Sequence, residues 1–274
     1  MTRNCWLILS LLIPSSLIAQ SPLKLWYNQP AAAWTEALPV GNGRIGGMVF
    51  GHVDNELIQL NESTLWSGGP VKGNVNPESP TYLPKVREAL AREDYTQAVD
   101  LVKHMQGLYT QSYMPLGDLS LKQNVNGAKP SGYYRDLDIQ KAIATTRFTA
   151  NGVTYKREVF ASAPDGVMII RLTASKPGQL TFDASTKSPL RFQHTANAKG
   201  ELVMSGKAPA QVDPNYYNSK DRQPVIYEDT EGCKGMRFQL RLKAINKGGS
   251  VQTDTAGIHV RQATEVLLLV AATT

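Results

Sequence analysis

The sequence predicts a mainly β protein: a large antiparallel β-sandwich (a two-sheet super-sandwich) with a short inserted helical hairpin. Short apolar stretches separated by turn residues recur from about Ile45 to the end of the chain. Asn151 and Gly152 stand between two strand-like runs, and both central residues of a tight primed hairpin turn need positive φ. The gaps between stretches are too short for the crossover helices that parallel strands require, so we expect antiparallel pairing.

Residues 1–20 have the order of a secretory signal peptide. A basic residue precedes an apolar run over 5–13, and a Pro-Ser-Ser break leads to the small residue Ala19. A membrane span usually needs about 20 continuous apolar residues, so we expect no stable membrane insertion. Cleavage near Ala19 or Gln20 would leave residues 21–274 as one β-sandwich domain of an exported protein, either periplasmic or extracellular.

The cysteine count and the charge pattern narrow the possible partners further. Without the signal peptide, Cys233 is the only cysteine, so the mature chain forms no internal disulfide. The formal net charge is +6, but the Lys and Arg residues are scattered singly and form no stripe, which argues against a nucleic-acid partner.

The expected strands are the apolar stretches that turn residues bound on both sides. They are Ile45–Val53, Glu56–Leu60, Leu119–Gln123, Leu137–Thr149, Val153–Phe160, Val167–Ala174, Gln179–Ala184, Met236–Ile245, Gly257–Arg261 and Thr264–Ala271.

One stretch has helical period instead of strand alternation. Apolar residues recur every three or four positions in Pro84–Arg92 and in Tyr95–Met105, which predicts a helical hairpin. Pro84 suits a first helical position, and Asp94 suits the cap of the second helix. Asp213–Thr230, which is rich in Pro, Tyr and charge, is expected to be a long loop.

The segment Gly41–Gly46 matches the dinucleotide-binding pattern GxGxxG, with an acidic residue about 20 positions later at Glu62. That pattern needs a preceding strand and a helix that opens at its end. The run that follows is too short and too rich in glycine for this helix. We therefore interpret the glycines as a tight turn with close backbone approach.

The same region carries a family resemblance. The motifs, in order, are WTEALPVGNGRIGG from Trp34, LNESTLWSG from Leu60, YMPLGDL from Tyr113, YYRDLD from Tyr133 and YKRE from Tyr155. Together they resemble the amino-terminal domain of glycoside hydrolase family 95, the α-L-fucosidases, over essentially all of the mature chain. One departure is Met114, where the family pattern has glutamine.

The resemblance implies a longer enzyme that hydrolyses terminal α-1,2-linked L-fucose with inversion, with some members preferring L-galactose. Inversion requires a carboxylic acid and an activated water on opposite faces of the sugar. In this family those groups belong to a helical barrel that lies outside this chain. We therefore expect no catalytic residue here and an inactive fragment. The implied partners are a fucosylated oligosaccharide or polysaccharide and the missing catalytic domain of the same polypeptide.

Five residues in the motifs are candidates for contact with sugar or with the catalytic domain, because amides and carboxylates pair with hydroxyls and an indole packs on a pyranose face. They are Asn42, Arg44, Asn61, Glu62 and Trp66. A structural reading stays open for each: Asn42 as a turn former, Trp66 as a core residue, and Asn61 with Glu62 as a network that fixes a loop.

Other polar residues of the motifs are expected to be structural. Turn chemistry or an ion pair is the expected role of Asp118 and of the pair Arg135 and Asp136. The four histidines are far apart and show no metal-ligand spacing, so we expect no metal site and no cofactor. Two alternatives remain open: a non-catalytic carbohydrate-binding module, and a phosphorylase-type enzyme with a similar β-domain.

Overall fold

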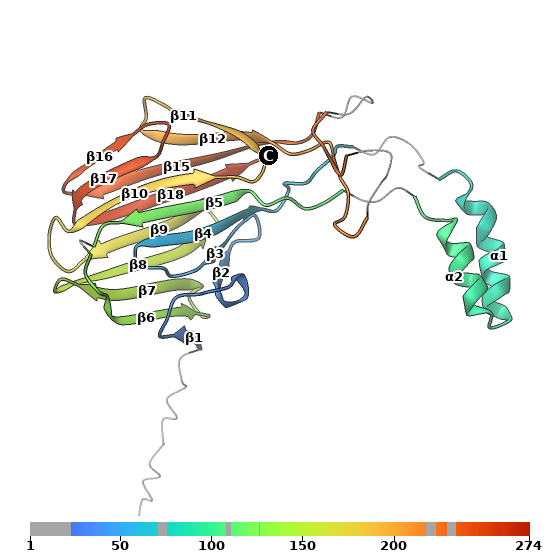
Figure 1. The fold of residues 1–274 in the computed structure, drawn as a ribbon, viewed down its shortest axis with the longest axis horizontal. Helices are drawn as coiled ribbons and strands as arrows, with labels where there is room; N and C mark the ends of the chain where they lie inside the picture. Colours follow the sequence, from blue (N-terminus) through green and yellow to red (C-terminus); the bar gives the residue numbers. More distant parts are fainter. Residues whose placement is uncertain (1–22, 71–75, 108–110, 126, 218–222, 229–233) are drawn as a thin grey trace, which may run out of the picture.

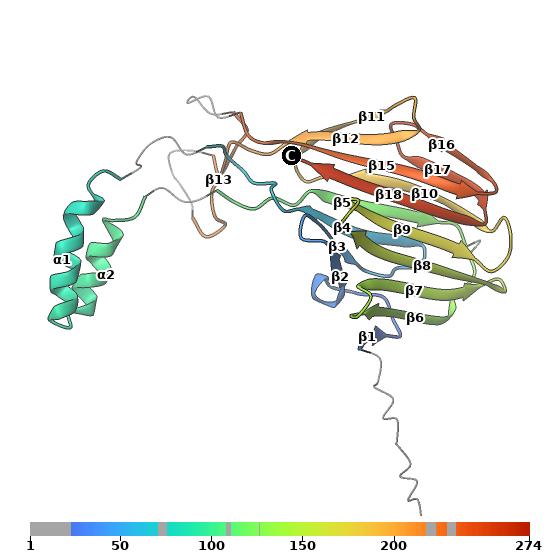
Figure 2. The same cartoon turned by 180° about the vertical axis from the view of Figure 1, so that it is seen from behind.

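The computed structural model of the protein describes residues 23–70, 76–107, 111–125, 127–217, 223–228 and 234–274. The expected signal peptide and Cys233 lie outside these residues. Two antiparallel sheets stack face to face, and a helical hairpin projects from one end of them, as Figures 1 and 2 show from opposite sides. The predicted two-sheet β-sandwich is confirmed. No helix in the described ranges has the length and apolar character that a bilayer span requires.

The larger sheet has nine strands within the described residues, in the order β1-β6-β7-β8-β9-β18-β15-β12-β11. Their bounds are β1 Lys24–Tyr27, β6 Ser131–Asp138, β7 Ile143–Ala150, β8 Val153–Ser162, β9 Val167–Ala174, β18 Glu265–Thr273, β15 Arg237–Lys247, β12 Glu201–Lys207 and β11 Arg191–Ala196. The hairpin of β7 and β8 turns at Asn151 and Gly152 with φ of 50° and 67°, as predicted.

The smaller sheet has seven strands in the described part of the chain, in the order β16-β17-β10-β5-β4-β3-β2. They are β16 Ser250–Thr253, β17 Ile258–Ala263, β10 Leu180–Lys187, β5 Gly117–Gln123, β4 Asn55–Glu62, β3 Ile45–Val49 and β2 Leu38–Gly41. A separate two-stranded ribbon pairs β13 (Gln211–Val212) with β14 (Val225–Ile226).

The core lies between the two sheets and follows the strand alternation. In β18, Val266, Leu268 and Val270 are fully buried, while the residues between them are half-buried on the other face. Because β18 pairs with both β9 and β15, it is a central strand of the larger sheet. Burying alternate apolar side chains against a second sheet is what drives this architecture.

The helical hairpin consists of α1 (Ser79–Ala91) and α2 (Tyr95–Lys103). Asp94 caps α2 as predicted, since its carboxylate accepts a hydrogen bond from the backbone N–H of Gln97 at 3.0 Å. The expected position of Pro84 is wrong. Helix α1 begins five residues earlier and has a proline in its first turn, so Pro84 lies inside it and removes one intrahelical hydrogen bond.

Several strand predictions also need correction. The expected single strand Leu137–Thr149 is divided into β6 and β7 by a turn at 139–142, where the Asp138 carboxylate accepts from the N–H of Lys141. Strands β1, β2, β11, β12, β13 and β16 were not predicted. Of these, β1 and β11 are exposed edges without apolar alternation. Within the predicted loop Asp213–Thr230, Val225 and Ile226 form β14.

Candidate functional site

The turn between β2 and β3 is built around the Asn42 side chain. The Asn42 amide oxygen accepts from the backbone N–H of Arg44 at 3.0 Å and of Ile45 at 2.9 Å. Gly43 has φ of 87°, which an L side chain rarely adopts. Since β2 and β3 form an antiparallel hairpin, the glycines make a tight turn and no nucleotide-binding helix follows.

The Glu62 carboxylate joins this turn to the loop after β4. It is fully buried and accepts from Arg44 Nε at 3.2 Å, and from the backbone N–H and the hydroxyl of Thr64 at 2.8 and 2.7 Å. Both carboxylate oxygens are therefore occupied. A carboxylate in this state fixes the loop and is poorly placed to transfer a proton to a substrate.

The same cluster reaches both sheets. The Asn42 amide nitrogen donates to the carbonyl of Ser162 at the end of β8, at 2.8 Å. The hydroxyl of Thr64 lies 2.5 Å from that of Thr274, just beyond β18. The cluster of Asn42, Arg44, Glu62 and Thr64 therefore sits at the end of the sandwich where the C label stands in Figure 1.

Asn61 and Trp66 do not join this cluster. Neighbouring residues of a strand point to opposite faces, so Glu62 faces the interior while Asn61 faces the outer surface of the smaller sheet. Trp66 is 44% exposed and packs against Tyr113 with ring centroids 5.5 Å apart. The reading of Trp66 as a core residue is wrong, because the neighbouring Leu65 is the fully buried residue of this segment.

Asn61 opens onto a cavity of about 330 Å³ on the outer face of the smaller sheet. Trp34, in the short 3-10 turn η1 (Trp34–Glu36), and Gln59 on β4 also line it. Asp118 lines it as well and accepts a hydrogen bond from Gln59 Nε2 at 3.2 Å. Trp34 and Gln59 were not among the predicted site residues. Strand alternation places Gln59 on the same face as Asn61, and this was the signal that could have indicated it.

Arg135 and Asp136 are structural, but they do not pair with each other. Asp136 accepts from Lys24 Nζ at 2.6 Å, which joins β6 to β1. Arg135 is buried on the opposite face, donates to the carbonyls of Gln29 and Glu36 at 2.8 Å, and lies over the ring of Tyr27. An ion pair therefore forms, but its cationic partner is Lys24.

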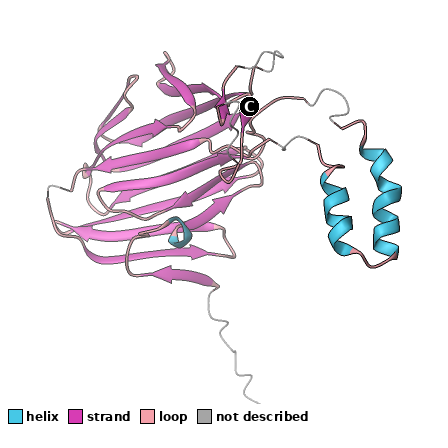
Figure 3. Ribbon diagram, turned by 45° about the vertical axis from the view of Figure 1, so that its right-hand side comes forward, coloured by secondary structure: helices cyan, strands magenta, loops and turns pink. Residues whose placement is uncertain are grey.

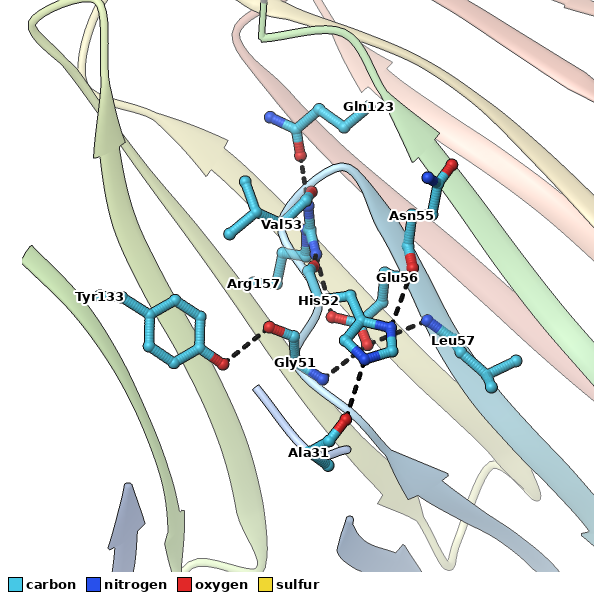
Figure 4. A network of polar contacts seen from close by, with 10 residues as sticks. All are labelled: Ala31, Gly51, His52, Val53, Asn55, Glu56, Leu57, Gln123, Tyr133 and Arg157. Atoms are coloured by element: carbon cyan, nitrogen blue, oxygen red, sulfur yellow. Dashed lines mark hydrogen bonds and ion pairs between the residues drawn. The ribbon is translucent and has the colours of Figure 1, made fainter. Parts of the chain in front are cut away.

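A second polar network, drawn in Figure 4, lies inside the sandwich around Glu56 and Arg157. Arg157 donates to the Glu56 carboxylate at 2.9 Å and to Gln123 Oε1 at 2.7 Å, and it also contacts the carbonyls of His52 and Val53. Glu56 also accepts from the N–H of Gly51 at 2.7 Å. Burial raises the pKa of the Glu56 carboxyl, an effect that the guanidinium of Arg157 opposes.

A carboxyl with a raised pKa is a usual candidate for a general acid, but this one is closed to solvent. Glu56 and Arg157 are each 2% exposed, and both carboxylate oxygens are hydrogen-bonded. The network ties the loop after β3 to β5 and β8, so its role is structural. Among the described residues, no three His, Cys, Asp or Glu side chains are grouped closely enough to hold a metal ion.

Comparison with known proteins shows relatives over the whole β-domain. Residues 25–274 match the family described as "Glycosyl hydrolase family 65, N-terminal domain". The chain is 34% identical over 257 residues to Alpha-L-fucosidase 2 of Arabidopsis thaliana, covering 92% of this chain and 30% of that protein. It is 32% identical over 240 residues to Probable alpha-fucosidase A of Aspergillus niger, covering 84% of this chain and 27% of that protein.

A solved structure, "Putative kojibiose phosphorylase from human microbiome", is 10% identical with a TM-score of 0.44, and the match covers 92% of this chain and 32% of that one. The chain spans less than a third of the length of the two curated relatives named above.

Proposed function

This chain belongs to the family of glycoside hydrolase amino-terminal domains, with the fucosidases of family 95 among its relatives, and we propose that it is the amino-terminal domain of an exported, inverting α-L-fucosidase. In this proposal the longer enzyme releases terminal α-1,2-linked L-fucose, or L-galactose, from oligosaccharides or polysaccharides. The β-domain supports catalysis without supplying the acid or the group that activates water.

The burial and hydrogen bonding of Glu62 are the observation that supports a β-domain without catalytic groups. Glu62 lies in the motif LNESTLWSG, yet it is fully buried and its two oxygens accept three hydrogen bonds from Arg44 and Thr64. An inverting mechanism needs a protonated carboxyl beside the leaving oxygen and a separate water-activating group across the sugar. Glu62 is closed to solvent and both of its oxygens are already hydrogen-bonded, which supports a positioning role for the motif.

The location of the cluster supports a contact with the rest of the polypeptide. Arg44 has a side chain that is 59% exposed, and it lies beside Thr64, which contacts Thr274. Any polypeptide that follows Thr274, as in the longer relatives, would therefore leave the sandwich next to Arg44 and Glu62. We propose that Asn42, Arg44 and Trp66 face the catalytic domain there.

The test compares residues 21–274 with the longer polypeptide that includes the following domains, using 2′-fucosyllactose as substrate. We expect fucose release from the longer polypeptide alone, with the inverted anomer appearing first by proton NMR. Fucose release by residues 21–274 at a comparable rate would contradict the proposal. A requirement for inorganic phosphate would instead favour a phosphorylase. Export is tested by amino-terminal sequencing of the secreted protein, which should begin near Gln20 or Ser21.

The alternative function, a non-catalytic carbohydrate-binding module, is favoured by one observation: the cavity beside Trp34 is open to solvent. It predicts fucoside affinity by calorimetry and no glycosidase activity from a polypeptide of any length. A reading frame that continues beyond Thr274 into sequence with long helical period would contradict it.

A further inference from the structure

The outer face of the smaller sheet holds a cavity of about 330 Å³ that the proposed function does not use. It lies between η1, the short cyan turn drawn over the sheet in Figure 3, and strands β2 to β5. Its side-chain lining includes Trp34, Pro39, Met48, Gln59, Asn61 and Asp118.

Strand register explains why these residues meet. Pro39 lies opposite Met48, Met48 opposite Gln59, and Gln59 opposite Asp118, so one row across four strands forms the floor. In a parallel row, Asn61 lies opposite Gly46, which in turn lies opposite Gly41. Because those two positions carry no side chain, the sheet is hollow beside Asn61.

Two neighbouring glycines of β3 differ in what requires them. A Cβ on Gly47 would lie 2.8 Å from Met168 Cε and 3.1 Å from Ile58, so the core packing demands glycine there. A Cβ on Gly46 would meet nothing nearer than the Val40 carbonyl oxygen at 3.8 Å, and Gly46 does not have positive φ. Core packing therefore requires glycine at position 47. At position 46 neither packing nor backbone conformation requires it, and the effect of the glycine is to leave the hollow open.

The cavity wall combines an aromatic face with amide and carboxylate groups. Trp34 is 58% exposed, and neither its indole N–H nor the half-buried Asn61 amide has a hydrogen-bond partner within the described residues. Gln59 donates to one oxygen of Asp118, which leaves acceptor capacity on both side chains. None of the described residues that line the cavity is Lys or Arg, so this lining does not favour an anionic ligand.

We propose that this cavity is a non-catalytic binding subsite for a neutral saccharide. An apolar face of a pyranose ring packs on the Trp34 indole, and its hydroxyls exchange hydrogen bonds with Asn61, Gln59 and Asp118. The volume lies at the lower end of the range for small-molecule sites, which suits one sugar unit or two. The inference does not rest on the proposed function, because it requires no hydrolysis and no further domain.

The experiment titrates the full chain with methyl α-L-fucoside and with methyl α-D-glucoside, followed by calorimetry and by tryptophan fluorescence. We expect saturable binding of at least one glycoside. In the variants Trp34→Ala and Asn61→Ala the affinity should fall by about tenfold or more, the loss expected when a stacking face or a hydrogen-bonded amide is removed. Calorimetry reads all variants, since Trp34→Ala removes the fluorescent reporter.

Gly46→Val is the sharpest variant, because it fills the hollow without touching the core and Val is favoured in strands. It should keep the thermal midpoint and lose binding. Trp26→Ala is the matched control, since Trp26 is 62% exposed on β1 and does not line the cavity. Unchanged affinity in Gly46→Val, equal loss in Trp26→Ala, or no saturable binding of either glycoside by the wild type would overturn the inference. Binding of the glucoside alone would still support the subsite and would leave the fucosidase proposal untouched, because that proposal does not use this cavity.

Discussion

The sandwich and the helical hairpin both carry apolar residues at regular spacing, but the hairpin buries few of them and leaves one stripe exposed. In β18, Leu268 and Val270 are fully buried between the sheets. In α2, Tyr95, Val99 and Val102 form one stripe at helical spacing, and they are 64%, 58% and 41% exposed. Figures 1 and 3 show the two helices standing away from both sheets.

This difference indicates two sources of stability. The sandwich is stabilised by apolar area removed from water, at about 25 cal/mol per Å². Helices of 13 and 9 residues are marginal in isolation, so the hairpin depends on packing between its helices and on the Asp94 cap of α2. Substitutions should therefore be costly in the sandwich and mild or local in the hairpin.

The largest effect is expected from the buried ion pair of the sandwich. Arg157→Met leaves the Glu56 carboxylate buried without a counter-charge and should lower the free energy of unfolding by about 3–5 kcal/mol. Urea unfolding followed by tryptophan fluorescence measures this loss. The double variant Glu56→Gln with Arg157→Met should be more stable than the single one. A loss below about 1 kcal/mol in the single variant would show that the pair is not needed.

Leu268→Ala tests the apolar core against the hairpin stripe. Removing a fully buried leucine from a central strand should cost about 2–5 kcal/mol in free energy of unfolding, the transfer cost plus a cavity. The matched variant Val99→Ala, at an exposed position, should change it by no more than about 0.5 kcal/mol. Similar losses in the two variants by urea unfolding would mean that the stripe on α2 is buried in solution.

A smaller and local effect is expected at the cap of α2. Asp94→Ala removes the hydrogen bond to the N–H of Gln97 and should cost about 1 kcal/mol of helix stability. Hydrogen exchange should then quicken for the amides of α2, while those of β18 keep their protection. Asp100→Asn, which affects only an exposed pair with Lys103, is the control and should leave the exchange almost unchanged. Faster exchange throughout β18 would contradict the independence of the two regions.

The smallest effect depends on pH. His259 on β17 lies 2.8 Å from the Asp183 carboxylate and 3.3 Å from that of Asp254, and the hydrogen bond to Asp183 raises the pKa of His259 above its usual value of 6.5. Because the folded state holds this proton more tightly than the unfolded state, the stabilisation is complete below about pH 6.5 and is lost as pH rises through the folded-state pKa. His259→Gln should therefore lower the thermal midpoint near pH 5.5 by more than near pH 8.5. Equal shifts at the two pH values would show that the charge of His259 does not matter.

The strands that sequence analysis predicted best are those with one buried face. Val153–Phe160 and Val167–Ala174 correspond closely to β8 and β9, because alternating apolar side chains reveal the core face of a strand. Strands β1 and β11 escaped prediction because they are exposed edges that bury almost nothing. Their pairing depends on backbone hydrogen bonds to a neighbouring strand, which leave no pattern in the sequence.

The candidate site also combines contacts that local sequence indicates with contacts that only strand pairing creates. Asn42, Arg44 and Glu62 come together because a turn and the register of β3 with β4 hold them. The sequence indicates the turn, and the structure supplies the register. Trp34 lies beside Asn61 and Asp118 only because strands β2 to β5 align side by side, and no short-range pattern indicates that contact.

The sequence alone predicted the β-sandwich, the helical hairpin, the capping role of Asp94 and the resemblance to family 95. It could do so because turn residues, apolar period and motif order are properties of neighbouring positions. Only the tertiary structure decided that Glu62 is closed off, that Trp66 is exposed and that a hollow lies beside Asn61. Those outcomes depend on which strands pair and which face each side chain takes, and long-range packing selects both.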